Sequence, residues 1–461
     1  MLKAALILTL LTCGAIDPSS AQVPADTVRL DLPAVIVRAL EVSPDLLAQR
    51  ARTRFADARL DEARAGRYLP EFKMTTAHAA APGLTNPNNT PTGQLYLDPS
   101  VRNDWQDLRP FNRVDVDFLQ PLWTGGQLSG LIGAAEAGRT YEESGLETTR
   151  EDVVRRAAEM YYLVLRLSEL GRVADEATDV LGKAKDEIKQ LLADGSPDVS
   201  DGDEFAVLIT EQEVRAQVAE VREQSRVARM ALRRQLMLDD AVVVMTDRVT
   251  LQRDFGPLDS LDTYLSLGLR NRPELAQIDA GVAAYSSLVQ VARSDYYPKL
   301  FWGVSANYSS AAGRYRQRNP YVGDSFLSRS LETGLGMRMN LNFSQTRSRV
   351  KQAQATADQA VAQQSAATQL VLFEVEQAYR GVRYRQVAAD AAEEALRLSK
   401  EWLRLEQVNF DTFGEGVDDL IKAVQANLKQ QAARHEAVFK LNMAHLDLIR
   451  AIGLGVDTMA H

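Results

Sequence analysis

The chain has 461 residues, of which 45% are hydrophobic and 25% are charged, and its formal net charge is −9 at pH 7. This length allows two or three ordinary domains or one elongated protomer, and the hydrophobic share is enough for a folded core. The charged fraction excludes a bundle of transmembrane helices, and the acidic balance argues against nucleic acid as the main partner.

The first predicted element is a secretory signal peptide over residues 1–21. Lys3 precedes an apolar run that ends near Ile16, and Ser19 and Ala21 occupy the −3 and −1 positions of a cleavage site. A short basic start, an apolar run and small residues before the cut are typical of a removable signal. We therefore expect an exported protein.

Cys13, the single cysteine, lies inside the signal's apolar run. We expect it to be removed with the signal, and lipid attachment is the alternative. A mature chain without a thiol excludes disulfides and cysteine–metal sites. No later stretch has about 18 uninterrupted apolar residues, so no spanning helix is predicted.

Two segments of the mature chain resemble each other. Pro44-Asp45-Leu46 in the first corresponds to Pro273-Glu274-Leu275 in the second. The similarity continues along both segments, so we predict two copies of one unit, at about 30–240 and 259–453. This period is far longer than that of the common solenoid repeats.

Each copy is predicted to begin with a helix of about 35 residues, rich in alanine and arginine, that a proline ends. Two strands around a polar loop follow, because apolar and polar residues alternate with period two. The predicted helices are Ala39–Pro70 and Gly268–Pro298, and the predicted strands are Glu71–Ala81, Asn112–Trp123, Leu300–Ser309 and Glu332–Asn342.

A very long helix comes next in each copy, and a return helix closes it. Residues 127–194 and 345–412 contain no proline, and each could form about 68 residues of helix, roughly 100 Å long. Heptad spacing predicts packing seams from Val153 to Leu192 and from Ala388 to Leu405. The return helices are predicted at Glu204–Met237 and Gly416–Ile452, after the breaks "ADGSPDVSDGDE" and "FGEGVDD".

No catalytic, metal or cofactor motif emerges. The histidines do not have the i, i+4 spacing of a helical metal pair. A glycine pair is weak evidence for a phosphate loop, and a strand-to-helix turn explains it. The residues concerned are His78, His435, His445 and His461, and Gly125 with Gly126.

The strands have the length of membrane-spanning strands, about 9–11 residues. Aromatic residues gather at their ends, where the girdle of a membrane barrel would lie: Tyr68, Trp123, Tyr296, Tyr297 and Trp302. A water-soluble sheet can also alternate. If the strands do span a membrane, four cannot close a barrel, and several chains must share one because lipid does not tolerate open strand edges.

The ordered set of features resembles the TolC family of outer-membrane factors. The signal, the duplicated Pro-Asp-Leu/Pro-Glu-Leu helix, the strand pairs and the segments "FLQPLWTGGQL", "LNLNFSQTRSRV" and "NFDTFGEGVDDLIKAVQANL" carry this resemblance. It implies a homotrimer in the outer membrane with a large periplasmic portion. Its implied partners are outer-membrane lipid, a periplasmic adaptor and an inner-membrane pump or ABC transporter.

The resemblance implies a mostly α fold class with a small β part. Long α-helical hairpins would form an α-barrel, and four membrane strands per chain would close a 12-stranded β-barrel in the trimer. The implied function is the exit duct of a tripartite efflux or type I secretion system, gated at its periplasmic tip. The residues leave open an exported soluble coiled-coil scaffold or adaptor, which explains the helices but not the strands. A secreted enzyme is the third reading.

By the same resemblance, the turn at Gly414, Glu415 and Gly416 belongs to the periplasmic tip. Asp419 best matches an acid of the family's aperture, and Asp418 stands beside it. The alternative role is helix capping, since acids in a first turn complement the helix dipole. Both roles can hold at once.

Lys422 departs from the family pattern, which often has a second acid three residues after the first. Asp419 and Lys422, at i and i+3, would share one helix face, and this leaves the charge of the constriction open. Copy one has a longer and more acidic counterpart turn, read as a solvated loop, an adaptor contact or a charged pore ring. Its residues are Gly195, Asp198, Asp201, Gly202, Asp203 and Glu204.

The polar side chains of the strands are the last candidate group. In a membrane barrel they would face the lumen, whereas in a soluble sheet they would face solvent. We select Arg113, Asp115, Asp117 and Arg338 as lumen residues.

Overall fold

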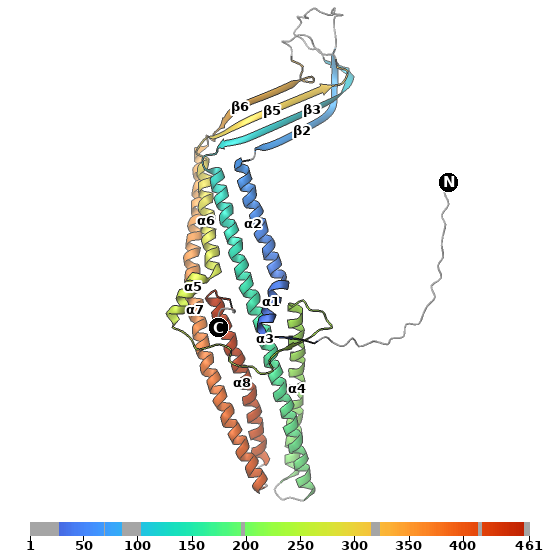
Figure 1. The fold of residues 1–461 in the computed structure, drawn as a ribbon, viewed down its shortest axis with the longest axis vertical. Coiled ribbons are helices and arrows are strands. Elements are labelled where there is room, and N and C mark those ends of the chain that lie inside the picture. Colours follow the sequence, from blue (N-terminus) through green and yellow to red (C-terminus); the bar gives the residue numbers. More distant parts are fainter. Residues whose placement is uncertain are drawn as a thin grey trace, which may run out of the picture. The chain divides into compact units, whose positions relative to one another are not determined.

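The computed structural model describes residues 27–68, 70–84, 103–194, 199–314, 323–413 and 417–455. The fold is mostly helical with a small β part, which confirms the predicted fold class (Figure 1). None of the helices within these ranges is long and apolar enough to cross a membrane. The helices are α1 Leu32–Val42, α2 Pro44–Tyr68, α3 Gln127–Ala193, α4 Asp201–Gln235, α5 Leu261–Asn271, α6 Pro273–Ser294, α7 Phe343–Phe413 and α8 Val417–Ala451. The strands are β1 Thr27–Leu30, β2 Glu71–Leu84, β3 Asn103–Trp123, β4 Val243–Thr246, β5 Lys299–Ala311 and β6 Arg329–Arg338.

The chain forms two compact units, and α3, α7 and α8 each continue from one into the other. The sheet unit comprises Pro44–Val153, Phe255–Arg383 and Ala444–His461. The tip unit comprises Met1–Ser43, Val154–Asp254 and Tyr384–Met443.

An antiparallel sheet of four strands, in the order β2-β3-β5-β6, ends the sheet unit. Figure 1 shows α2, α3, α6 and α7 meeting this sheet at the same end of its strands. The two central strands come from different parts of the chain and pair directly, with Val114 opposite Tyr308. The outer strands β2 and β6 each have one neighbour among the described residues, so each leaves one edge open.

Each predicted 35-residue helix is in fact two helices. The first breaks at Ser43 before Pro44, and the second at Arg272 before Pro273. Proline has no N–H to donate and disfavours the helical conformation in the residue before it. Arg272 accordingly has extended backbone angles, with φ −62° and ψ 116°. The prolines start α2 and α6 instead of lying inside them.

The strand boundaries also differ from the prediction, because the pairing of each strand with its neighbour decides where the strand ends. Sequence alternation runs on to Asn342, but β6 ends at Arg338, whose partner Lys299 is the first residue of β5. Conversely, β2 passes the predicted end at Ala81 and stays paired with β3 through a register shift between Pro82 and Gly83.

The tip unit contains two helical hairpins, α3–α4 and α7–α8. The predicted seam of α3 is largely buried, as Val164, Leu167, Leu181 and Ile188 illustrate. Near the α3–α4 turn, Ile188 packs with Val199 and Val207, and Leu420 and Ile421 of α8 lie against them. The first turns of α8 are thus anchored on the other hairpin.

The predicted seam of α7 is largely exposed with respect to the described residues. Leu398, Trp402 and Leu405 are 52%, 41% and 57% exposed. The helix instead buries a different face, which includes Val382 and Ala389. Heptad spacing thus identified an apolar stripe, which the described residues leave largely uncovered.

A linker over residues 247–254 is fastened to α3 by buried polar bonds. Glu169, only 1% exposed, accepts a hydrogen bond from the backbone N–H of Leu251 at 3.0 Å and another from Arg172 at 2.7 Å. The hydroxyl of Tyr162 donates to Asp254 at 2.8 Å. Buried polar groups need such partners, so Glu169 is a structural residue of the tip unit.

Replacing Glu169 with Ala should leave the Leu251 N–H buried without an acceptor. Such a group costs about 1–3 kcal/mol, and this cost should appear as a lower free energy of unfolding and faster amide exchange over the linker. Glu187→Ala, which removes an exposed carboxylate from the same helix, is the control. Equal effects in the two variants would contradict the role assigned to Glu169.

Candidate functional site

The four-stranded sheet has one polar and one apolar face, as its register shows. On the polar face, Lys73, Asp117, Ser305 and Glu332 form one row across the four strands, and Thr75, Asp115, Asn307 and Ser330 form the next. On the apolar face, the corresponding rows are Phe72, Phe118, Val304 and Thr333, then Met74, Val116, Ala306 and Leu331. Directly opposed residues of an antiparallel pair lie on the same face.

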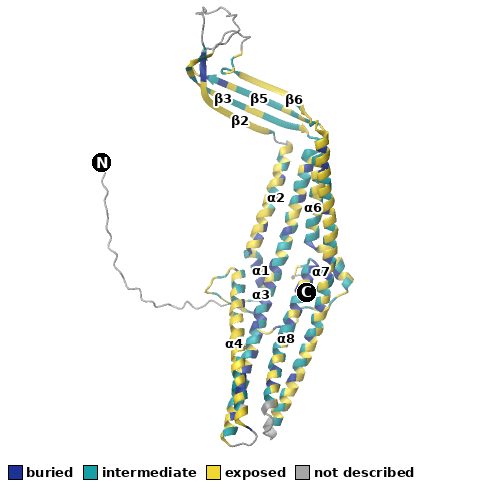
Figure 2. Ribbon diagram, turned by 180° about the vertical axis from the view of Figure 1, so that it is seen from behind, coloured by how far each residue is buried: buried dark blue, intermediate teal, exposed yellow. Residues whose placement is uncertain are grey.

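Large side chains of the apolar face are exposed, and Figure 2 shows most of β2 and β6 in the colour of exposed residues. Leu331 and Leu335 of β6 are 74% and 80% exposed, and Phe72 of β2 is 70% exposed. The ring of Phe118 contacts those of Phe72 and Trp302 edge-on, at centroid distances of 5.2 and 5.1 Å. A soluble monomer rarely exposes so large an apolar surface, so this face requires an apolar environment.

Aromatic residues mark both ends of this face. Trp123 contacts Tyr297 at the end next to the helices, with 6.1 Å between ring centroids. At the other end, the guanidinium of Arg329 lies 5.2 Å from the ring centre of Tyr308. Amphipathic rings at two levels around an apolar band are typical of a membrane-spanning sheet.

A hydrogen-bond network covers the polar face. Arg113 donates two bonds to Asp115, at 2.8 and 3.0 Å, and Asn307 also donates to Asp115. Ser305 donates to Asp117 at 2.8 Å. Three of the four predicted strand residues are therefore close together on β3, whereas Arg338 lies at the helix end of β6, 5.8 Å from the centre of the Phe301 ring.

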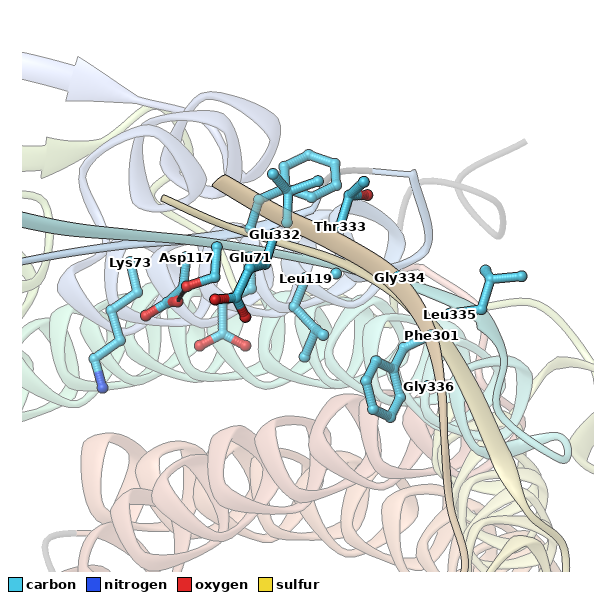
Figure 3. A pocket seen from close by; sticks show the side chains of 14 residues that line it. Glu71, Lys73, Asp117, Leu119, Phe301, Glu332, Thr333, Gly334, Leu335 and Gly336 are labelled. Atoms are coloured by element: carbon cyan, nitrogen blue, oxygen red, sulfur yellow. Dashed lines mark hydrogen bonds between the residues drawn. The ribbon is translucent and has the colours of Figure 1, made fainter. Parts of the chain in front are cut away.

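A shallow hollow of about 550 Å³ lies on the polar face. Figure 3 shows the carboxylates of Glu71, Asp117 and Glu332 on the same side of the sheet as Leu119 and Phe301, while Thr333 and Leu335 point the other way. A Cβ at Gly336 would lie 2.3 Å from the Phe301 ring, so the glycine lets this ring lie flat on β6.

Glu71, Lys73 and Glu332 were not among the predicted site residues, although they line this hollow. The signal was present in the sequence. Glu71 and Lys73 alternate with Phe72 and Met74, as the charged residues of β3 alternate with apolar ones.

In the tip unit, the predicted Asp419–Lys422 pair forms. Lys422 donates to Asp419 at 3.0 Å, and both side chains are about 60% exposed. Asp201 is exposed at the first position of α4, next to Gly202. The positive end of the helix dipole stabilises an acidic side chain in the first turn. A capping role and a pore role are therefore compatible at Asp201 and at Asp419.

The remaining predicted tip residues cannot be placed. Gly195, Asp198, Gly414, Glu415 and Gly416 lie outside the described residues, and the side chains of Asp203 and Asp418 are not described.

The histidines are not brought together as a metal site, and the described ranges contain no group of three or more metal-binding side chains. His445 stacks on Phe255 at 4.9 Å, and its burial lowers its pKa to about 4. Burial also lowers the pKa of His435. His78 bonds Asn112 within the sheet, and His461 lies outside the described residues.

Comparisons with known proteins agree with this geometry. Residues 264–450 match the family model of outer membrane efflux proteins. The chain is 27% identical over 445 residues to OpmQ of Pseudomonas aeruginosa, a pyoverdine export outer membrane protein, and the match covers 92% of this chain and 85% of OpmQ.

Solved structures share the fold. A membrane protein from Pseudomonas aeruginosa superposes with a TM-score of 0.74 at 20% identity, over 95% of this chain and 96% of that one. The CmeC outer membrane channel of Campylobacter jejuni gives 0.71 at 17% identity, over 92% and 85%.

The chain is thus similar to outer membrane efflux channels in sequence over residues 264–450 and in fold over most of its length. It resembles the TolC-like family of outer membrane efflux proteins.

Arginine substitutions at adjacent residues on the two faces of β6 should have different effects on insertion into the outer membrane. Leu331→Arg places a cation on the apolar face, where an arginine costs about 2–4 kcal/mol near the bilayer midplane. We expect less protein in the outer-membrane fraction. Glu332→Arg, on the polar face, should insert normally. Equal insertion of both variants, measured by membrane fractionation, would show that the apolar face does not contact lipid.

Proposed function

We propose that three copies of this chain form the exit duct of a tripartite efflux or type I secretion system. The duct crosses the outer membrane through a shared β-barrel and is gated at its periplasmic tip. An adaptor and an inner-membrane pump or ABC transporter deliver the cargo to it.

The open edges of the sheet are the observation that carries this proposal. In hydrocarbon every backbone N–H and C=O needs a partner, yet β2 and β6 each have an unpaired edge within the described sheet. Pairing of β2 in one copy with β6 in the next satisfies both edges. Three chains with four strands each then give twelve strands, a closed barrel with the polar face inside.

Exposed stripes on the tip-unit helices support assembly independently. On α7, Leu398 and Leu405 are 52% and 57% exposed. On α4, Phe205 and Ile209 are 63% and 62% exposed, one helical turn apart. Apolar stripes of this kind bury their area against a neighbouring helix, and a second and third copy supply those helices.

The lumen and the gate follow from the same assembly. Arg113, Asp115, Asp117 and Arg338 line the barrel interior, together with Glu71, Lys73 and Glu332. The α7–α8 turn, with Asp419 and Lys422 just after it, surrounds the periplasmic opening with its counterpart between α3 and α4. The match to OpmQ supports an export role, and the transporter selects the cargo.

The assembly has a direct test. The protein should stay in the outer-membrane fraction until detergent is added, migrate as an SDS-resistant trimer and conduct ions in planar bilayers. Recovery as a soluble periplasmic monomer would overturn the duct and favour a coiled-coil scaffold.

Charge changes at the tip should test the gate. Asp419→Ala removes one exposed carboxylate from each of three copies, so cation selectivity should fall or resting conductance should change, because charged rings act on permeating ions. Lys422→Ala frees the carboxylate and should shift selectivity the other way. Unchanged selectivity and conductance in both variants would show that Asp419 is only a helix cap.

A further inference from the structure

The end of α8 is held in a tightly packed junction of the sheet unit. A Cβ at Gly268 of α5 would lie 2.8 Å from Val375 of α7 and 3.4 Å from the carbonyl oxygen of Ala451. Gly453 has φ +67°, and a Cβ there would lie 2.6 Å from the carbonyl oxygen of Asn271. Side chains at these two glycines would push the helices apart, so α5 packs closely on the backbone at the end of α8 and on Val375 of α7.

Arg272 fastens this junction. Its side chain is 6% exposed and donates to Glu274 of α6 at 3.0 Å, to Glu374 of α7 at 2.5 Å and to the carbonyl oxygen of Ala451 at 3.2 Å. Arg450 of α8 extends the contacts to α3 by donating to Asp152 at 2.9 Å. Two guanidinium groups thus join α3, α6, α7 and α8.

Glu151 is a further carboxyl group beside these two arginines, and neither arginine bonds it. It is half-buried on α3, and the charges facing it are Glu274 and Arg272 at the start of α6, Arg450 on α8 and its neighbour Asp152. Those other acids already accept bonds from the arginines, whereas Glu151 has no hydrogen bond or ion pair within the described part of the chain. We call Glu151, Asp152, Arg272, Glu274, Glu374 and Arg450 the Arg272 cluster.

Protonation decides the charge balance of the cluster. With Glu151 neutral, three carboxylates face two arginines. When it ionises there are four, and the added charge lies in a partly desolvated site next to Glu274. Burial and the repulsion of Glu274 raise the pKa of Glu151 from 4.5 to about 7.

We propose that Glu151 is a proton-responsive switch, whose ionisation loosens the Arg272 cluster and releases the end of α8. Because α8 begins at the tip turn and ends in this cluster, release at one end permits movement of the gate at the other. The gating part of this inference rests on the proposed channel function, whereas the local release of α8 does not.

The sign of the effect follows from linkage. The pKa of Glu151 is higher in the packed cluster than in an opened one, so the packed form binds the proton more tightly. Packing is therefore strongest below pH 4.5, weakens as the pH rises, and reaches its minimum above about pH 7. In the fully coupled limit, opening increases about tenfold per pH unit in this window.

Hydrogen exchange in the intact full-length protein tests the local step. The exchange rates of the amides at the end of α8, residues 448–453, are measured in wild type and in Glu151→Gln from pH 4.5 to 8. The ratio of the two rates at each pH cancels the intrinsic pH dependence of exchange. This ratio of wild-type to variant rates should rise through this range and level off near pH 7. A ratio that stays flat would overturn the switch.

Glu147→Gln is the matched control, because it removes an exposed carboxylate one turn away on the same helix. It should follow the wild-type exchange profile; an equal loss of pH dependence in this control would also overturn the assignment to Glu151.

Conductance in planar bilayers tests the gating step: wild-type conductance should rise with pH about a midpoint near 7, and Glu151→Gln should remove that rise. Coupling to the gate fails if the two channels respond identically, whereas a wild type silent at every pH refutes the duct itself.

Discussion

The unsatisfied backbone edges of a four-stranded sheet are the constraint on which the rest of this molecule depends. A sheet with one apolar and one polar face can cross a bilayer only if its edges are paired, since lipid supplies no hydrogen-bond partners. One chain cannot close the ring with four strands. The two-faced sheet, the open edges and the exposed helix stripes are therefore all explained by one arrangement, the proposed assembly of several copies.

Much of this organisation could be predicted because the signals are local. Period-two alternation located all four strands of the sheet, and the absence of proline located both long helices. The predicted duplication at about 30–240 and 259–453 stays a prediction. It agrees with the element order, in which two helices, two strands and two long helices occur twice. What local signals could not supply was the partner of each surface: heptad spacing located the α7 stripe, but not the helix that covers it.

The errors have specific physical causes. Pro44 and Pro273 lie within apolar periodicity that continues on both sides, and the loss of one backbone donor outweighs that periodicity. The alternation after Arg338 has no strand to pair with, since β5 begins at Lys299. The Arg272 cluster could not be foreseen at all, because its charges come from four helices far apart in sequence and only the tertiary fold brings them together.

The position of charge in the chain bears on how such a duct can be controlled. At the tip, Asp419 and Lys422 form an exposed pair, and exposed pairs contribute about 0–1 kcal/mol and are screened by salt. Such a pair can bias the ions near an opening, but it cannot hold helices together against the forces of assembly. The buried contacts of Arg272 can do so, because a desolvated charge that loses its partner costs several kcal/mol. Both ends of α8 are therefore held by packing, but their charges differ. The first turn carries the exposed Asp419–Lys422 pair beside its apolar contacts with the other hairpin, whereas the last turn is held by the buried contacts of Arg272.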